Sequence, residues 1–135
     1  DMHRPADWHL VTARRLYDLA MTRGWDDEHG GLVYGYAPDG SFADAHKYFW
    51  VHAEAIATAW RLYDRTGDAR YRTDYDRLWS WSWDHLVDHK HGAWYRITTR
   101  EGEWLEPYKS PAGKVDYHTM GACWDVLSVM RAAGS

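Results

Sequence analysis

The sequence has a single cysteine, Cys123, so no disulfide can form within its 135 residues. A chain without disulfides is typical of a reducing compartment, and we expect a cytoplasmic location. Long hydrophobic runs are missing too. No uninterrupted apolar stretch approaches the roughly 18 residues of a membrane-spanning helix, and no secretory signal is visible, so we expect no membrane partner.

Basic residues are fewer than acidic ones. The chain has 16 lysines and arginines and 20 aspartates and glutamates, so its net charge is −4. The chain therefore lacks the basic surface that binds nucleic acid, and we expect no such partner. Aromatic residues are abundant, with ten tryptophans and ten tyrosines. Rings in this number fill the spaces between helices or line a cavity for a planar or sugar-like ligand.

An internal repeat organises the chain. Residues 25–34 read "WDDEHGGLVY" and residues 87–96 read "VDHKHGAWYR", offset by 62 positions. Such self-similarity is the signature of a repeat architecture, in which each copy is one supersecondary unit. These matched residues more readily shape a loop than react, because they recur with the fold. The pairs are Asp26 and Asp88, His29 and His91, and Gly30 and Gly92.

Each copy contains two predicted helices around its motif. An amphipathic helix precedes it, at about 6–23 and 68–87, and a helix that is apolar nearly all round follows, at about 44–65 and 116–132. Short β-like pairs with turns separate the two helices of each copy, at 31–42 and 93–104. The outer helices are exposed to water and surround inner helices that are buried, which is the arrangement of an α/α toroid. The repeats alone equally permit an open α-solenoid.

His118 is the first candidate for chemistry. Asp116 is a good N-cap, which places Tyr117 and His118 in the first turn of the last helix. A helix N-terminus disfavours the imidazolium, so the ring should stay neutral and able to accept a proton. The alternative is a core histidine that donates to a backbone carbonyl.

Glu54 is the second candidate, because it interrupts the most apolar helix of the chain. A buried carboxylate must be paired, hydrogen-bonded or facing a wet cavity. Trp50 lies four residues earlier on the same face, and a ring beside a carboxylate is a common way to hold a sugar. The alternative is a structural ion pair with Lys47 or with an arginine from a neighbouring unit. The helical step points His52 away from both residues, so we treat it as a weak candidate.

Other reactive residues carry weaker signals. The spacing of His85 and His89 is compatible with a metal, but they end an outer helix, and Asp27 replaces His89 in the other copy, so we expect no metal. Lys109 could contact a substrate oxygen near His118, or be a solvated loop lysine. Cys123 lies one turn beyond His118 and is predicted to be a small core residue.

Taken together, the motifs resemble the N-acylglucosamine 2-epimerase superfamily, which includes cellobiose 2-epimerases and mannose isomerases. Four segments carry the resemblance, in this order: "GWDDEHGG" (24–31), "KYFWVHAEAIA" (47–57), "DHKHGAWY" (88–95) and "KSPAGKVDYHTM" (109–120). The resemblance implies an all-α, (α/α)6-barrel fold. Residues 1–135 would be the C-terminal part of one catalytic domain, here as two helix-hairpin repeats.

The resemblance also implies a reaction at C2 of a free reducing sugar, with no metal or other cofactor. His118 would remove the C2 proton of the open-chain sugar and form an enediol. Trp50 and Glu54 would line the sugar site, and Trp94 stands at the family's aromatic position after the glycine loop. The substrate would be a monosaccharide or disaccharide, and a second copy of the chain, in a homodimer, is a possible partner.

The sequence departs from the family pattern in one respect: it lacks the second histidine that the reaction needs. The family uses a second histidine in a His-x-x-Glu segment, and neither His3 nor His9 fits it. We therefore expect an incomplete copy of a protein near three times this length, with that histidine upstream. Two other hypotheses stay open: a glycoside hydrolase or lyase, which needs two acids at the site, and a non-catalytic carbohydrate-binding scaffold.

Overall fold

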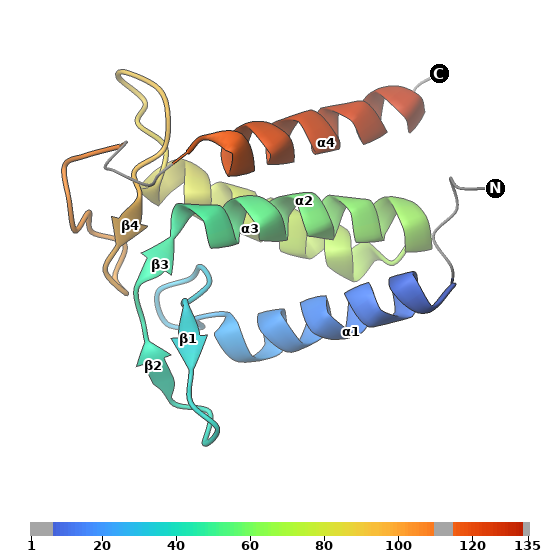
Figure 1. Cartoon of the computed structure of the whole chain (residues 1–135), viewed down its shortest axis with the longest axis horizontal. Helices are drawn as coiled ribbons and strands as arrows, with labels where there is room; N and C mark the ends of the chain where they lie inside the picture. The colour runs from blue at the N-terminus through green and yellow to red at the C-terminus, as the bar shows by residue number, and fades with distance from the viewer. Residues whose placement is uncertain (1–6, 110–114, 134–135) are drawn as a thin grey trace.

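The computed structural model describes residues 7–109 and 115–133, and within them it contains four helices (Figure 1). Their bounds agree with the prediction to within about two residues, except that α2 begins five residues later than expected. None of these helices is both long and apolar enough to cross a membrane. The helices are α1 (Asp7–Gly24), α2 (Phe49–Thr66), α3 (Ala69–His85) and α4 (Tyr117–Ala133).

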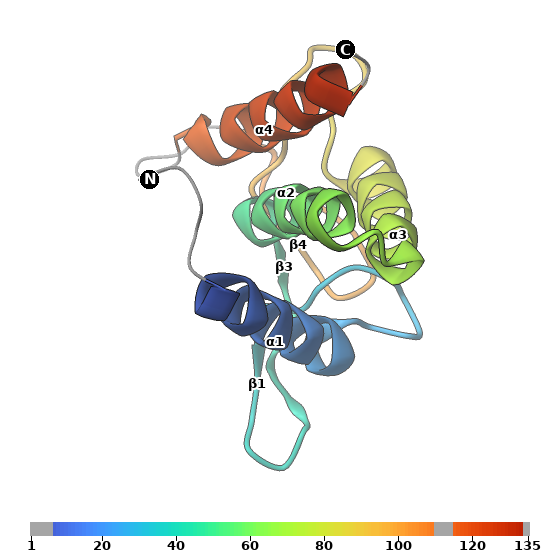
Figure 2. The same cartoon turned by 90° about the vertical axis from the view of Figure 1, so that its right-hand side faces the viewer.

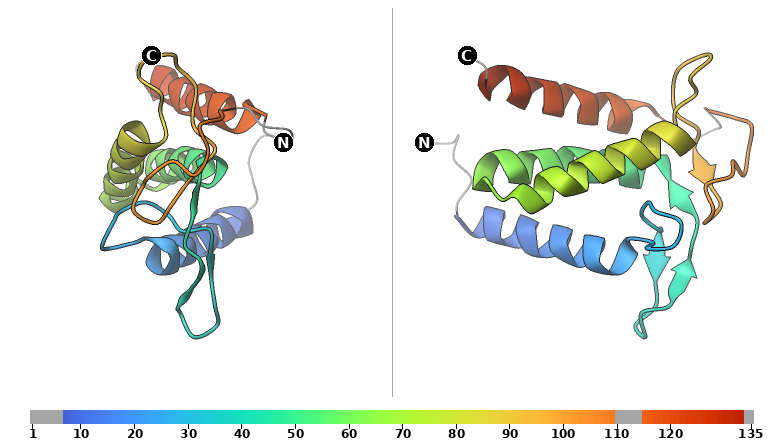
Figure 3. Two further views of the ribbon diagram at one scale, coloured as in Figure 1. Left: turned by 90° about the vertical axis from the view of Figure 1, so that its left-hand side faces the viewer. Right: turned by 180° about the vertical axis from the view of Figure 1, so that it is seen from behind.

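The helices lie roughly parallel, with successive ones running in opposite directions (Figure 1). Viewed along their axes, α1, α2 and α4 form a column, and α3 packs beside α2 (Figure 2). All the strands gather at one end, where α1 and α3 end and where α2 and α4 begin (Figure 3). This end therefore collects the N-termini of both predicted inner helices.

Short strands replace the first turn that was predicted for α2. Strand β1 (Gly35–Tyr36) pairs with β2 (Phe42–Asp44) in the expected hairpin. Strand β3 (Lys47–Tyr48) pairs with β4 (Ile97–Thr98), with Lys47 opposite Thr98. This second ladder joins the two repeats and was not predicted, because its partners are about 50 residues apart in sequence.

A tight connection reverses the chain between α2 and α3. Gly67 adopts a left-handed conformation (φ 69°) at the end of α2, where its N–H donates to the carbonyl of Tyr63. The carboxylate of Asp68 then caps α3 by accepting from the backbone N–H of Arg70 at 3.0 Å. The two helices consequently pack as an antiparallel pair.

The core forms where α2 meets the other helices, and its largest buried residues include Tyr71, Leu78 and Leu86. Two expectations about burial are wrong. On α1 the amphipathic pattern predicts a buried apolar face that includes Trp8 and Leu16, but both residues are exposed, and Tyr17 and Met21 face the core instead.

Helix α4 is the second exception, because it is buried on one side only. Ala122 and Val126 face α2 and α3, whereas Met120 and Trp124 are exposed. Cys123 is exposed as well, so its predicted place in the core is wrong. An apolar composition all round a helix indicates burial only where neighbours cover every side, and in the part of the chain that the structure describes α4 has neighbours on one side.

Candidate active site

His118 lies in the first turn of α4, as predicted, at the end of the molecule where the strands gather (Figure 1). The carbonyl of Asp116 accepts hydrogen bonds from the backbone N–H of Met120 at 2.9 Å and from the hydroxyl of Thr119 at 3.0 Å. These bonds start the helix immediately before Tyr117. The imidazole side chain is about one-fifth exposed, so it is neither sealed in the core nor freely solvated.

Glu54 reaches His118 from the neighbouring helix α2. The Nδ1 atom of His118 lies 2.7 Å from Oε1 of Glu54, a hydrogen bond between residues 64 positions apart in sequence. With the ionised carboxylate as acceptor, Nδ1–H donates and the neutral ring carries its lone pair on Nε2. The alternative partner of Glu54, Lys47, is instead buried with Asp26.

An aromatic surface adjoins this pair. The ring of Trp50 lies 5.8 Å from that of His118, centroid to centroid, with 35° between their planes. The ring centroids of Tyr117 and Phe49 lie 3.9 Å and 6.1 Å from that of the imidazole. An acid, an imidazole and an indole on one open surface have the composition of a sugar-binding site, in which a ring packs on C–H groups and polar groups take hydroxyls.

The structure brings together three of the five predicted site residues and places the other two elsewhere. Trp94 is buried in the core, where its ring lies 6.1 Å from that of Trp79. Lys109 donates from Nζ to a carboxylate oxygen of Asp88 at 2.6 Å and to the carbonyl of Gly92 at 2.8 Å. To contact a substrate oxygen, Lys109 would have to leave both partners.

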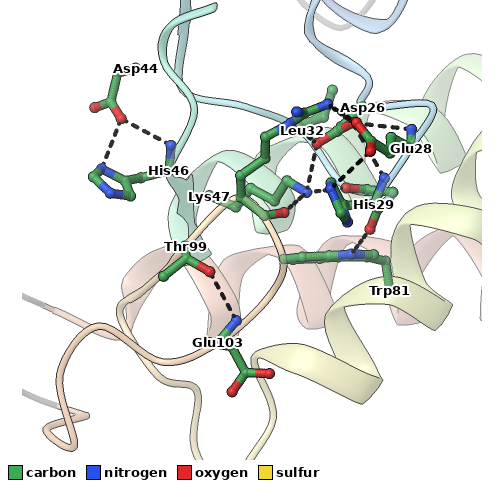
Figure 4. Close-up of polar contacts among 12 residues, drawn as sticks. Asp26, Glu28, His29, Leu32, Asp44, His46, Lys47, Trp81, Thr99 and Glu103 are labelled. Carbon is green, nitrogen blue, oxygen red and sulfur yellow. Dashed lines mark hydrogen bonds and ion pairs between the residues drawn. The ribbon is translucent and has the colours of Figure 1, made fainter.

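The contacts of Lys109 repeat those of Lys47, which lies 62 positions earlier. Lys47 is fully buried, and its Nζ donates to Asp26 at 3.2 Å and to the carbonyls of Gly30 and Arg100 (Figure 4). The sequence interpretation matched the aspartates and glycines of the two copies but missed these lysines. The common offset of 62 was the signal that could have found them.

Asp26 and Asp88, the aspartates that pair with Lys47 and Lys109, also shape their own loops, as predicted. Oδ1 of Asp26 accepts from the backbone N–H groups of Glu28 and His29 (Figure 4). Oδ1 of Asp88 accepts in the same way from Lys90 and His91 in the second copy. Burial opposes ionisation of Asp26, but the hydrogen bonds from Arg100, the loop and Lys47 hold its pKa well below its usual range. The Lys109 ammonium does the same for the pKa of Asp88.

His52 points away from Trp50 and Glu54, as the helical step predicted, and is fully buried. Its Nε2 accepts the backbone N–H of Leu32 at 3.0 Å, its Nδ1 lies 3.0 Å from the carbonyl of Tyr48, and its ring stacks on Trp81. These contacts select the neutral ring with the proton on Nδ1. Burial lowers the pKa of His52 to about 4, so it is a structural histidine of the loop–helix junction.

The two histidines considered for a metal have other contacts. His85 stacks on Trp81 with 4.7 Å between the ring centroids, and Nε2 of His89 donates to the carbonyl of Trp83 at 2.8 Å. Across residues 7–109 and 115–133, no three histidine, cysteine, aspartate or glutamate side chains converge to hold a metal ion.

Comparison with known proteins adds to this geometry. The family model described as N-acylglucosamine 2-epimerase matches residues 1–122. A D-mannose isomerase of Marinomonas mediterranea is 52% identical over 96% of this chain and 33% of its own length. A D-mannose isomerase of Thermobifida fusca is 36% identical over 87% of the chain and 29% of its length. The chain thus spans about a third of the length of these relatives.

Solved structures have the same fold. A crystal structure of a D-mannose isomerase superposes with a TM-score of 0.90 at 52% identity, covering 95% of this chain and 33% of that one. A cellobiose 2-epimerase from Spirochaeta thermophila superposes with a TM-score of 0.79 at 20% identity, covering 96% and 35%, which is a likeness of fold. The predicted fold class, an α/α toroid present as two helix-hairpin repeats, is confirmed.

Proposed function

The chain belongs to the N-acylglucosamine 2-epimerase family, and we propose that it carries one half of the catalytic site of a sugar 2-epimerase or aldose–ketose isomerase. The observation that carries the proposal is the hydrogen-bonded pair of His118 and Glu54 beside the ring of Trp50. The D-mannose isomerases among the relatives favour interconversion of mannose and fructose.

His118 acts as the base. Its Nε2 takes the proton from C2 of the open-chain aldose, and the electron pair of the broken C–H bond becomes the C1=C2 bond of an enediolate, whose negative charge moves to O1. Isomerisation is completed when a proton is added to C1 and the proton of the O2 hydroxyl is transferred to O1, which gives the neutral ketose. Epimerisation is completed instead when a proton returns to the opposite face of C2.

Glu54 orients the base and stabilises its charged form. The 2.7 Å bond fixes the ring so that Nδ1 is the protonated atom, which leaves the lone pair of Nε2 for the substrate. When Nε2 gains the proton of C2, the resulting imidazolium lies against a carboxylate. The developing positive charge is therefore met by an acceptor that is already in place, without rearrangement.

Trp50 supplies the surface on which the sugar lies. A hexose presents C–H groups on its faces and hydroxyls on its edges, so the indole packs on the face while Glu54 and His118 meet the polar edge near C2. Trp94 and Lys109, the other two predicted site residues, do not face the sugar in this arrangement. The core position of Trp94 and the ion pair of Lys109 give both a supporting role behind the surface.

The reaction needs a second proton-transfer group, which the family resemblance assigns to a His-x-x-Glu segment that this sequence lacks. Activity is therefore measured on a protein of the relatives' full length that contains this chain, called the full-length protein below. Incubation with D-mannose, D-fructose or N-acetylglucosamine in D2O should place deuterium at C2 of an aldose or C1 of a ketose. NMR spectroscopy follows the exchange.

The His118→Asn change should lower this exchange by about 10²–10⁴-fold, because a positioned general base contributes that much. The matched control is His89→Asn, at an exposed histidine that has no part in the proposed site, and it should leave the exchange unchanged. Near-normal exchange in His118→Asn would refute the assignment. Release of new reducing ends from an added oligosaccharide, without exchange, would indicate a hydrolase, and neither product would indicate a binding scaffold.

A further inference from the structure

A second polar contact joins α2 to α4, further along both helices than the pair of Glu54 and His118. The guanidinium of Arg61 donates from Nε to Oδ2 of Asp125 at 3.0 Å, and its Nη2 lies 2.7 Å from Oδ1. Both carboxylate oxygens are engaged, and this two-point geometry gives an arginine–carboxylate pair a fixed direction. The two side chains are 53% and 39% exposed, so the pair lies on an open face of the helices.

The two contacts are in the same register. Each joins residues that are 64 positions apart, and the second contact lies seven residues beyond the first on both α2 and α4. The two helices run in the same direction and lie side by side (Figures 1 and 2). Seven residues make two helical turns less about 20°, so both contacts occupy the same facing edges of the helices, about 10.5 Å apart along the axes.

Small side chains form the surface between α2 and α4 at these levels. Ala53, Ala57 and Ala122 are buried there and form an apolar cluster of their own. The register of two packed helices normally comes from side chains of one helix that fit between those of the other, and a methyl group makes only a low ridge. This cluster therefore lets the helices approach closely but does little to oppose a slide or a rotation of α4.

The hydrogen bond of His118 depends on this register. Its Nδ1 lies 2.7 Å from Oε1 of Glu54, and a hydrogen bond of this kind is lost when the distance grows by about 1 Å. Around a single contact, α4 can pivot or slide against α2, because the contact bends while the helices move. A second contact about 10.5 Å away along both helices opposes these movements and keeps the imidazole in place.

We propose that Arg61 and Asp125 are positioning residues, which hold α4 in register with α2 so that His118 keeps its hydrogen bond to Glu54. The inference rests on the proposed function, because the ion pair acts through the base and the carboxylate of that site. Arg61 and Asp125 take no direct part in the reaction, since they lie two helical turns from the residues that do.

Steady-state kinetics of the full-length protein test this role. Arg61→Ala should lower kcat for the interconversion of mannose and fructose by about 3–10-fold, with KM changed less than about twofold, because the base is misplaced rather than removed. The midpoint of thermal unfolding should shift by about 2 °C or less, since an exposed ion pair contributes little stability. The matched control is Arg65→Ala, which removes an exposed arginine one turn further along α2 and should leave kcat and KM unchanged.

Reversal of the ion pair separates positioning from a need for either side chain alone. Asp125→Arg, with Arg61 unchanged, places two cations opposite each other and should lower kcat at least as much as Arg61→Ala. The combination of Arg61→Asp with Asp125→Arg restores an ion pair of opposite polarity. It should bring kcat back to within about threefold of the unmodified protein, as expected for two residues that act through their mutual contact.

Two further measurements ask whether Arg61 acts through the pair of Glu54 and His118. In the Glu54→Gln variant, Arg61→Ala should lower kcat less than about twofold, because the contact that it supports has already lost its charge. The second measurement needs no turnover. Proton NMR of the protein with nitrogen-15-labelled histidine observes the Nδ1–H of His118, which is assigned by its loss in His118→Asn. Arg61→Ala should broaden or remove this signal, and the reversed pair should restore it.

The outcomes also separate this inference from the proposed function. An unchanged kcat and an unchanged Nδ1–H signal in Arg61→Ala would overturn the positioning role. Equal losses of kcat in the unmodified and Glu54→Gln backgrounds, or a reversed pair that restores nothing, would overturn it too. If the Nδ1–H signal responds as expected but no sugar exchanges deuterium, the proposed chemistry is refuted and the positioning role stands.

Discussion

The buried position of His52 predicts a loss of stability in mild acid. The unfolded chain takes up a proton at this residue near its ordinary pKa of 6.5, whereas the folded protein resists protonation until about pH 4. Between these two pH values the unfolded state binds more protons than the folded state. The stability that neutral His52 contributes is therefore complete above pH 6.5 and is lost as the pH falls toward 4.

The structure sets the size of this effect. At roughly 1.4 kcal/mol per pKa unit, the fall of the pKa from 6.5 to about 4 corresponds to about 3.5 kcal/mol. The physical cause is that protonated Nε2 can no longer accept the N–H of Leu32, so a buried donor would lose its partner and a buried ring would gain a charge. An effect of this size is a large part of the net stability of an ordinary domain.

Urea unfolding, followed by tryptophan fluorescence at pH values from 4 to 7.5, measures the loss. The variant His52→Leu should be destabilised by about 2–4 kcal/mol at pH 7, because the N–H of Leu32 is left without its acceptor and the ring contacts are lost. Its free energy of unfolding should then change little between pH 6.5 and 4, so the two curves converge. The matched control His91→Leu, at an exposed histidine, should keep the slope of the unmodified protein.

Asp26 and Asp88 do not change the free energy of unfolding between pH 6.5 and 4. Their depressed pKa values mean that the stability they contribute is present above their ordinary value of 3.8 and is lost as the pH falls below it. A free energy of unfolding that stays flat from pH 6.5 to 4, or an equal slope in His52→Leu, would refute the reasoning about His52.

Three other predictions follow from contacts in the same region. Gly31→Ala should destabilise by about 2 kcal/mol or more, measured by urea unfolding, because it adds a Cβ 2.7 Å from the ring of Trp81 at φ +75°; Gly40→Ala, at φ +89° in open space, should cost only about 1 kcal/mol, and equal losses would contradict the contact. Lys109→Met should lower thermal stability, by about 1–3 kcal/mol, while KM changes less than about twofold; a large rise in KM at unchanged stability would instead identify a direct substrate contact. Glu54→Gln keeps a hydrogen bond to His118 but loses the charge that meets the imidazolium, so kcat should fall about 10–100-fold with KM nearly unchanged; a kcat close to that of the unmodified protein would exclude the role.

Much of the fold could be predicted from the sequence because the relevant signals are local. The helices follow from a 3.6-residue apolar period, and their ends follow from residues such as Gly67 and Asp68 within one turn. The 62-residue offset predicted two copies of one unit, and the i, i+4 spacing placed Trp50 and Glu54 on one face. Asp116, as the predicted N-cap, likewise placed His118 in the first turn of α4.

The tertiary structure alone decided which of these local surfaces meet. The helical period does not predict that the face of α2 that bears Glu54 lies against the first turn of α4. It also does not predict that β3 pairs with a strand of the other repeat. The same holds for Lys109. A lysine can bind a substrate oxygen, but only the fold shows that Asp88 is its partner. The physical reason is that side-chain pairs separated by about 60 residues depend on how two helices rotate and slide against each other, and that choice is made by the packing of the whole core.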